Sequence, residues 1–178
     1  MNWHAVRAFA LFQIVWIVAA VGAARGLSWP GISAAAAAVG LHAASAKGRN
    51  GLLSIAAAGA LGLLGESALA VFGLLCYSAP WPFEMLAPAW IVALWLAYGT
   101  TIAATRQAIG SWSLPTQAML GALLGPLSYL AGEKCGALVL ADPRWLSLLA
   151  TALLWATAFP LLLYANGKLE TARNPTFM

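Results

Sequence analysis

Long apolar runs separated by short polar segments dominate the pattern of this sequence. A helix that crosses a bilayer needs ~20 mostly apolar residues, and six stretches of the chain meet this requirement. We predict spans near residues 5–24, 27–45, 52–77, 85–105, 116–141 and 145–166. The pattern therefore predicts an all-α polytopic membrane bundle, with one transmembrane domain over residues 1–178 that ends in a polar cytoplasmic tail at 167–178.

Helices explain these runs better than strands. A β span needs only ~9–11 residues of alternating polarity, and a helix pairs all its backbone groups within itself, as hydrocarbon requires. The alanine-rich second stretch is the weakest, so five spans are the alternative. The first and fourth stretches do not resemble each other beyond hydropathy, nor do the third and sixth, and we expect no inverted repeat.

The basic residues predict the orientation. With six spans, both termini share a side with the second and fourth loops. That side carries Arg7, Lys47, Arg49, Arg106, Lys168 and Arg173, and the opposite side carries Arg25 and Arg144. Loops rich in Lys and Arg stay cytoplasmic, so we predict both termini in the cytoplasm. Five spans would move the later loops to the other side and remove this bias, so the charges also favour six.

Composition agrees with a bilayer as the main partner. Hydrophobic residues make up 62% of the chain and charged residues 8%, against ~45–50% and ~25% in soluble domains. The net charge of +4 comes from single cations between apolar blocks, which fits cytoplasmic loops better than nucleic acid.

The cysteines and histidines are too few and too scattered to indicate a metal or a cofactor. Cys76 and Cys135 both fall in the outer half of the predicted bundle. A disulfide between them is one interpretation, and two separate thiols are the one we favour. Arg7 and the apolar residues after it also resemble a signal peptide. Because the rest of the chain is itself apolar, we expect this segment to remain as the first helix.

Charge within the apolar stretches is the most informative chemical feature. Glu66 lies midway along the third stretch, and Glu133 and Lys134 lie in the outer half of the fifth. A charge at the bilayer centre costs at least ~2.5–3.5 kcal/mol, so such residues normally face the bundle interior. We expect Lys134 to reach Glu66 if these helices are neighbours, because Glu66 and Glu133 lie within about one turn in depth.

These residues define a candidate intramembrane polar site of Glu66, Glu133, Lys134, Tyr129 and Gln13. Tyr129 precedes Glu133 by four residues, so hydroxyl and carboxyl can meet on one helix face. Such a site can carry protons, bind a polar headgroup or perform acid/base chemistry. Its alternative is structural: an ion pair or a protonated Glu that holds helices together, with Lys134 extended to the interface.

Small residues form a stripe on the fifth stretch. They are Gly121, Gly125, Ser128, Gly132 and Gly136. Their spacing places them on one helix face, where a second helix can approach closely. Pro126 removes one hydrogen bond and predicts either a packing kink or a cavity lined by the freed carbonyl. We favour packing within the chain; the alternative is a docking face for a homo- or hetero-oligomer.

Three functions remain open at this point. There is no HExxH, no GxSxG and no phosphate-binding loop, and the loops are too short for a soluble catalytic domain. The first hypothesis is binding or transport of a small or lipid-like molecule at the polar site. The second is an enzyme of lipid or isoprenoid metabolism that uses Tyr129, Glu133 and Lys134 as acid/base groups. The third is a non-catalytic subunit or assembly factor of a membrane complex.

Two short strings resemble a known family. They are Pro88-Ala-Trp90-Ile-Val-Ala-Leu94-Trp95 and Gly125-Pro126-Leu-Ser128-Tyr129-Leu-Ala-Gly132, together with Gln13 and Trp16. With them, most of the chain resembles an uncharacterised family of small bacterial multi-pass inner-membrane proteins, known only as a domain of unknown function. The resemblance implies a bacterial inner-membrane location and a multi-pass fold, and it supplies no catalytic residue.

Overall fold

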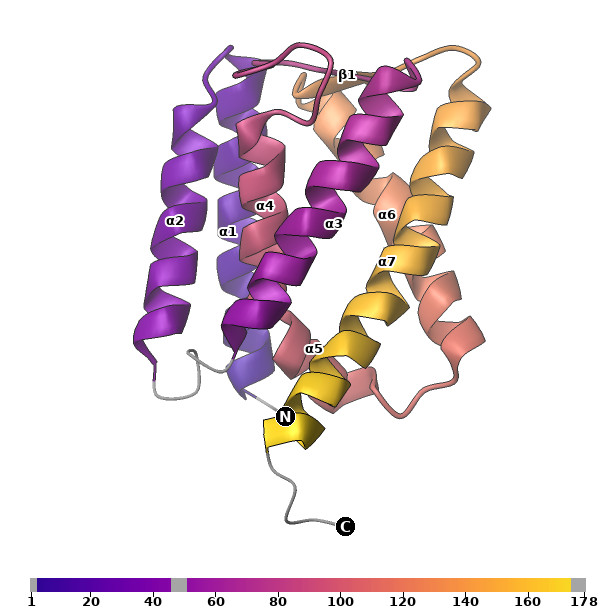
Figure 1. Cartoon of the computed structure of the whole chain (residues 1–178). Helices are drawn as coiled ribbons and strands as arrows, with labels where there is room; N and C mark the ends of the chain where they lie inside the picture. Colours follow the sequence, from indigo (N-terminus) through magenta and orange to yellow (C-terminus); the bar gives the residue numbers. More distant parts are fainter. Residues whose placement is uncertain (1–2, 46–50, 174–178) are drawn as a thin grey trace.

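The fold is a helical bundle closed at one end by a pair of short strands (Figure 1). The computed structural model describes residues 3–45 and 51–173, so Lys47 and Arg49 of the charge prediction lie outside the described residues. Within these ranges the elements are α1 Trp3–Ala24, α2 Trp29–Ala44, α3 Leu52–Val71, β1 Leu75–Tyr77, α4 Ala89–Gly99, α5 Ile102–Ile109, α6 Leu114–Lys134, β2 Leu138–Leu140 and α7 Arg144–Arg173. The expectation of an all-helical architecture is confirmed, apart from the two strands.

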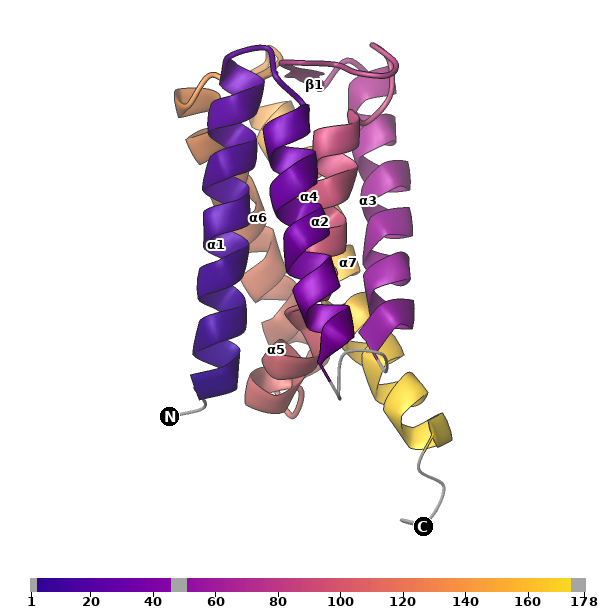
Figure 2. The ribbon, with the colours of Figure 1, turned by 90° about the vertical axis from the view of Figure 1, so that its left-hand side faces the viewer.

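The helices stand side by side, and the chain passes back and forth between two ends of the bundle (Figures 1 and 2). The described N- and C-terminal helix ends lie together at what we call the terminal end, and β1 and β2 lie at the opposite, strand end. Helix α4 contacts α1, α2 and α3, while α6 packs mainly on α7. Helix α4 is therefore the central element, and its two tryptophans, Trp90 and Trp95, are buried.

Large apolar side chains cover much of the outer surface. Phe9, Leu64 and Leu127 are 60%, 70% and 58% exposed. Among the described residues, three helical segments are long and apolar enough to cross a bilayer, namely Val6–Ala24, Leu52–Val71 and Arg144–Leu169. An outer surface this apolar is unfavourable in water and favourable in lipid. The fold therefore indicates association with a membrane.

The prediction of one helix over 85–105 is wrong. The segment contains two helices, α4 and α5, with a break at Thr100 and Thr101. The two threonine hydroxyls donate to the carbonyls of Ala97 and Tyr98, at 2.7 Å each. Hydrogen bonds from a side chain to a nearby carbonyl compete with the backbone hydrogen bonds that continue a helix. Helix α4 alone has 11 residues, or about 16 Å at ~1.5 Å per residue, which is shorter than a ~30 Å hydrocarbon core.

The predicted helices at 52–77 and 116–141 are too long at their C-terminal ends. Glycines with left-handed φ follow both helices, Gly73 at +67° and Gly136 at +80°. After each glycine the next N–H bonds back to the helix, Leu74 to Leu69 and Ala137 to Gly132, both at 2.9 Å. This is the Schellman arrangement, which ends a helix and reverses the chain.

Short antiparallel strands, rather than further helix, follow these two glycines. Leu75 pairs with Leu140 and Tyr77 with Leu138. These four side chains are buried, whereas Cys76 is exposed. The pair therefore covers the strand end of the bundle and directs Tyr77 inward. At the other end α7 continues as helix to Arg173, so the helix is longer than the predicted span at 145–166 and runs into the predicted polar tail.

Candidate functional site

A buried carboxylate lies where four elements of the bundle meet. Glu66 on α3 is 1% exposed. Its Oε1 accepts hydrogen bonds from the Tyr129 hydroxyl at 2.5 Å and from Trp95 Nε1 at 2.7 Å. Its Oε2 accepts a bond from the Tyr77 hydroxyl at 2.5 Å. One acidic side chain thus connects α3, β1, α4 and α6.

Aromatic rings of α4 and α7 pack around these donors. Trp155 on α7 donates from Nε1 to the Tyr129 hydroxyl at 3.3 Å. The indoles of Trp95 and Trp155 are stacked, with centroids 4.7 Å apart and planes at 24°. Tyr98 packs edge-on against both. We call Glu66, Tyr77, Trp95, Tyr129 and Trp155 the Glu66 centre.

Two glycines make this arrangement possible. Gly62 lies one helical turn before Glu66, and a Cβ on it would lie 2.1 Å from Trp95 Cγ. Gly125 lies one turn before Tyr129, and a Cβ on it would lie 2.5 Å from Trp155 Cγ. Neither position has space for a side chain. Each glycine therefore lets one tryptophan lie against a helix backbone, beside the polar group one turn further along.

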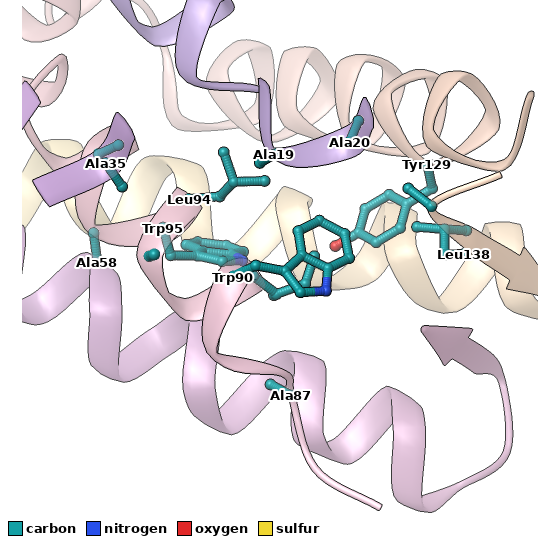
Figure 3. Packing of buried hydrophobic residues seen from close by; sticks show 14 of the residues in the cluster. Ala19, Ala20, Ala35, Ala58, Ala87, Trp90, Leu94, Trp95, Tyr129 and Leu138 are labelled. Carbon is teal, nitrogen blue, oxygen red and sulfur yellow. The ribbon is translucent and has the colours of Figure 1, made fainter. Parts of the chain in front are cut away.

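The interior side chains come from segments far apart in the sequence. Figure 3 shows Trp90, Trp95 and Tyr129 directed into the space between the ribbons, with small side chains such as Ala19 and Ala20 around them. Trp90 belongs to a neighbouring contact, because its Nε1 donates to the Ser78 carbonyl at 3.0 Å. Tyr77 packs edge-on against Trp90, with centroids 6.2 Å apart. The Glu66 centre is therefore enclosed on the strand side as well.

The three hydrogen bonds do not use all the acceptor positions of the Glu66 carboxyl group. A carboxylate offers about four acceptor positions, and three are filled, two on Oε1 and one on Oε2. All three donors are neutral, and none of the described basic side chains forms an ion pair with Glu66. Oε2 can therefore take one more hydrogen, either a proton of its own or a donor from a bound molecule.

Only one of the other predicted site residues joins Glu66, and that is Tyr129. Lys134 is exposed at the last position of α6, so the expected contact with Glu66 is not formed. Glu133 accepts from the Leu140 N–H at 3.0 Å and pairs with Arg144, so it does not meet Tyr129 either. Both residues lie at the strand end because α6 ends there. Gln13 on α1 is exposed, away from the centre.

Helix α7 covers two residues of the small-residue stripe, Gly121 and Gly125. A Cβ on Gly121 would lie 2.3 Å from the Trp155 carbonyl oxygen, and Gly125 faces the same residue. The Ser128 hydroxyl donates to the Gly125 carbonyl at 2.7 Å. Gly132 lies near Leu138 of β2, and Gly136 lies beyond the end of α6. Pro126 lies within α6.

The sequence reading missed most of the donors. The candidate site predicted from the sequence includes Tyr129 but not Tyr77, Trp95 or Trp155. Glycine four residues before each polar group, Gly62 before Glu66 and Gly125 before Tyr129, is the signal in the sequence that marks these sites. The alternative of a disulfide is also settled, because Cys76 and Cys135 are free and exposed.

Comparison with known proteins gives one match. A family model described as "Protein of unknown function (DUF2878)" matches residues 5–161. No curated protein and no solved structure matches the chain. The matched range includes all five residues of the Glu66 centre and ends within α7.

Proposed function

Because the chain belongs to the DUF2878 family of proteins of unknown function, whose name assigns no activity, we propose the function from the Glu66 centre. The protein is a multi-pass membrane protein that binds or transports a small or lipid-like molecule at this centre. The observation that carries the proposal is a fully buried acidic side chain held by three neutral donors from three other elements.

The proposed membrane arrangement has six passes with both termini in the cytoplasm. Helices α4 and α5 together make one pass, from Ala89 to Ile109, and the other five long helices make one each. Lys134 ends α6 at the strand end, so among the described residues the strand side holds three basic residues, and the terminal side holds four, Arg7, Arg106, Lys168 and Arg173. The excess of Lys and Arg still favours a cytoplasmic terminal end, and the resemblance supports a bacterial inner membrane.

Energetics favour a functional role for Glu66. Glu66 lies nearer the strand end than the predicted midpoint, because α3 ends at Val71. A buried acidic side chain among apolar helices is still costly, and intramembrane ionisable residues commonly mark substrate or proton pathways. Three hydrogen bonds offset part of the cost, but a neutral side chain would avoid it altogether. An acidic group held by neutral donors favours a ligand that presents a hydrogen-bond donor or a positive charge.

Of the three functions that the sequence left open, binding or transport has the most support. The enzyme hypothesis needs Tyr129, Glu133 and Lys134 in one place, but Tyr129 bonds Glu66 while Glu133 bonds Arg144. The subunit hypothesis used the glycine stripe for docking, but Gly121 and Gly125 of that stripe face Trp155 of the same chain. An oligomer through α6 would use its leucine face instead, where Leu123, Leu124 and Leu127 are exposed.

Glu66→Gln tests the proposal directly. The substitution keeps the shape of the side chain but removes its negative charge, so we expect loss of the bound molecule. Native mass spectrometry of protein purified in a mild detergent measures this as a mass adduct present in the wild type and absent from the variant. Glu133→Gln is the matched control and is expected to retain the adduct.

Thermal unfolding in the same detergent separates loss of ligand from loss of fold. A folded Glu66→Gln variant with the same adducts as the wild type would refute the proposal. So would a wild-type protein that carries no adduct and whose deletion phenotype the Glu66→Gln variant restores in full.

A further inference from the structure

A cavity of about 480 Å³ opens toward the terminal end of the bundle, and none of the residues that line it belongs to the Glu66 centre. Its lining residues come from α5 and the segment after it, from the start of α6, and from the second half of α7. Two basic residues, Arg106 and Lys168, line it together with two aromatic residues, Trp112 and Tyr164. No acidic residue lines the cavity within the described part of the chain.

The backbone of α7 positions the arginine. A Cβ on Gly167 would lie 2.8 Å from both Nε and Nη2 of Arg106, so the missing side chain leaves space for the guanidinium directly against α7. A guanidinium has five N–H donors, so Arg106 can serve a bound anion in addition to a partner within the chain. The ammonium of Lys168 lies 5.5 Å from the centre of the Tyr164 ring. Two cations thus approach one cavity from adjacent helices.

The rim of the cavity matches the level of lipid headgroups. Trp112 and Tyr164 are 47% and 63% exposed, and Leu114 beside them is 67% exposed. Indole and phenol rings favour the membrane interface because one part is apolar and another part hydrogen-bonds. An occupant therefore meets the two cations next to exposed aromatic and apolar side chains. That combination fits an amphipathic anion.

We propose that this cavity binds the phosphate group of an anionic phospholipid, with the acyl chains lying along the outer face beside Leu114. Basic pockets between helices on the cytoplasmic side of a membrane bind anionic headgroups by the same chemistry. The inference uses the membrane arrangement proposed above and none of the residues of the Glu66 centre, so the two proposals can fail separately.

Titration with defined lipids tests the assignment. Phosphatidylglycerol is added to the full-length protein in mild detergent, and its binding is followed by native mass spectrometry, with zwitterionic phosphatidylcholine as the comparison. We expect phosphatidylglycerol to bind more tightly. Lys168→Gln should weaken it about 5-fold, the loss expected for one cation near the surface. Lys134→Gln makes the same change in charge at the strand end, and we expect it to leave the affinity unchanged.

Two results would overturn the assignment. One is equal loss of phosphatidylglycerol affinity in the Lys168→Gln and Lys134→Gln variants, which would mean general charge attraction rather than a site. The other is competition by inorganic phosphate at concentrations similar to those of the lipid, which would make the ligand a soluble anion. Lys168 is exposed, so its substitution leaves the packed interior intact, and a thermal unfolding curve checks this.

Discussion

At the scale of single residues, the position of Glu66 depends on neutral donors rather than on a cation. The sequence suggested an ion pair with Lys134, but two phenols and an indole satisfy the carboxylate instead. Because these donors are neutral, the buried carboxyl group can gain or lose a proton or a ligand, and no cation is left unpaired in the interior. A buried unpaired charge is among the most destabilising defects in a protein.

Removal of one tyrosine hydroxyl at a time should show how much each hydrogen bond around Glu66 contributes to stability. Tyr129 donates to Glu66 and accepts from Trp155, whereas Tyr77 has one such bond. Tyr129→Phe should therefore destabilise the protein more than Tyr77→Phe, with each unsatisfied buried group costing ~1–3 kcal/mol. Unfolding in detergent, followed by circular dichroism, measures the difference. Tyr164→Phe, at an exposed tyrosine, is the control; equal losses in all three would contradict the network.

At the scale of elements, two parts of the chain repeat the same order of features. Glu66 and Tyr129 are 63 residues apart, and the same interval separates Gly62 from Gly125 and Gly73 from Gly136. In each part, a helix carries a glycine and, one turn later, a polar group. A glycine in the Schellman arrangement then ends the helix, and a strand follows. A tryptophan from a helix later in the chain packs against the first glycine. One part supplies the acceptor and the other a donor. The sequence comparison missed this because it paired the third stretch with the sixth rather than with the fifth.

Alanine substitutions at Gly62 and Gly125 should separate the effect of packing on stability from the effect of helix propensity. Gly62→Ala and Gly125→Ala place a Cβ against Trp95 and Trp155, and overpacking of this kind costs about 1–3 kcal/mol. Gly40→Ala, on α2 with nothing within 4 Å, should be neutral or stabilise the helix by up to ~1 kcal/mol. Thermal unfolding of the three variants measures the contrast. A gain in stability at Gly62 or Gly125 would show that no tryptophan lies there.

At the scale of the whole molecule, the two ends of the bundle differ in chemistry. The strand end carries the exposed thiols of Cys76 and Cys135 and the Glu133–Arg144 ion pair. The terminal end carries the cationic cavity. In the proposed six-pass arrangement these ends face opposite sides of the membrane, with the Glu66 centre between them.

Thiol labelling tests this arrangement. A membrane-impermeant maleimide applied to intact spheroplasts should label Cys76 and Cys135, because the strand end faces outward in the proposal. In a Cys76→Ser, Cys135→Ser background, Thr171→Cys should be labelled only after the membrane is permeabilised. Labelling of Thr171→Cys in intact spheroplasts would place the terminal end outside and reverse the orientation.

The sequence by itself determined the helical class, the family and the cost of burying Glu66, because hydropathy and charge are local properties of the chain. It could also have marked the ends of α3 and α6 at Gly73 and Gly136, where a left-handed residue ends the helix. Only the tertiary structure decided which side chains satisfy the carboxylate. Tyr77, Trp95 and Tyr129 reach Glu66 from separate elements, and their convergence depends on helix packing and strand pairing, which no periodicity within one segment specifies.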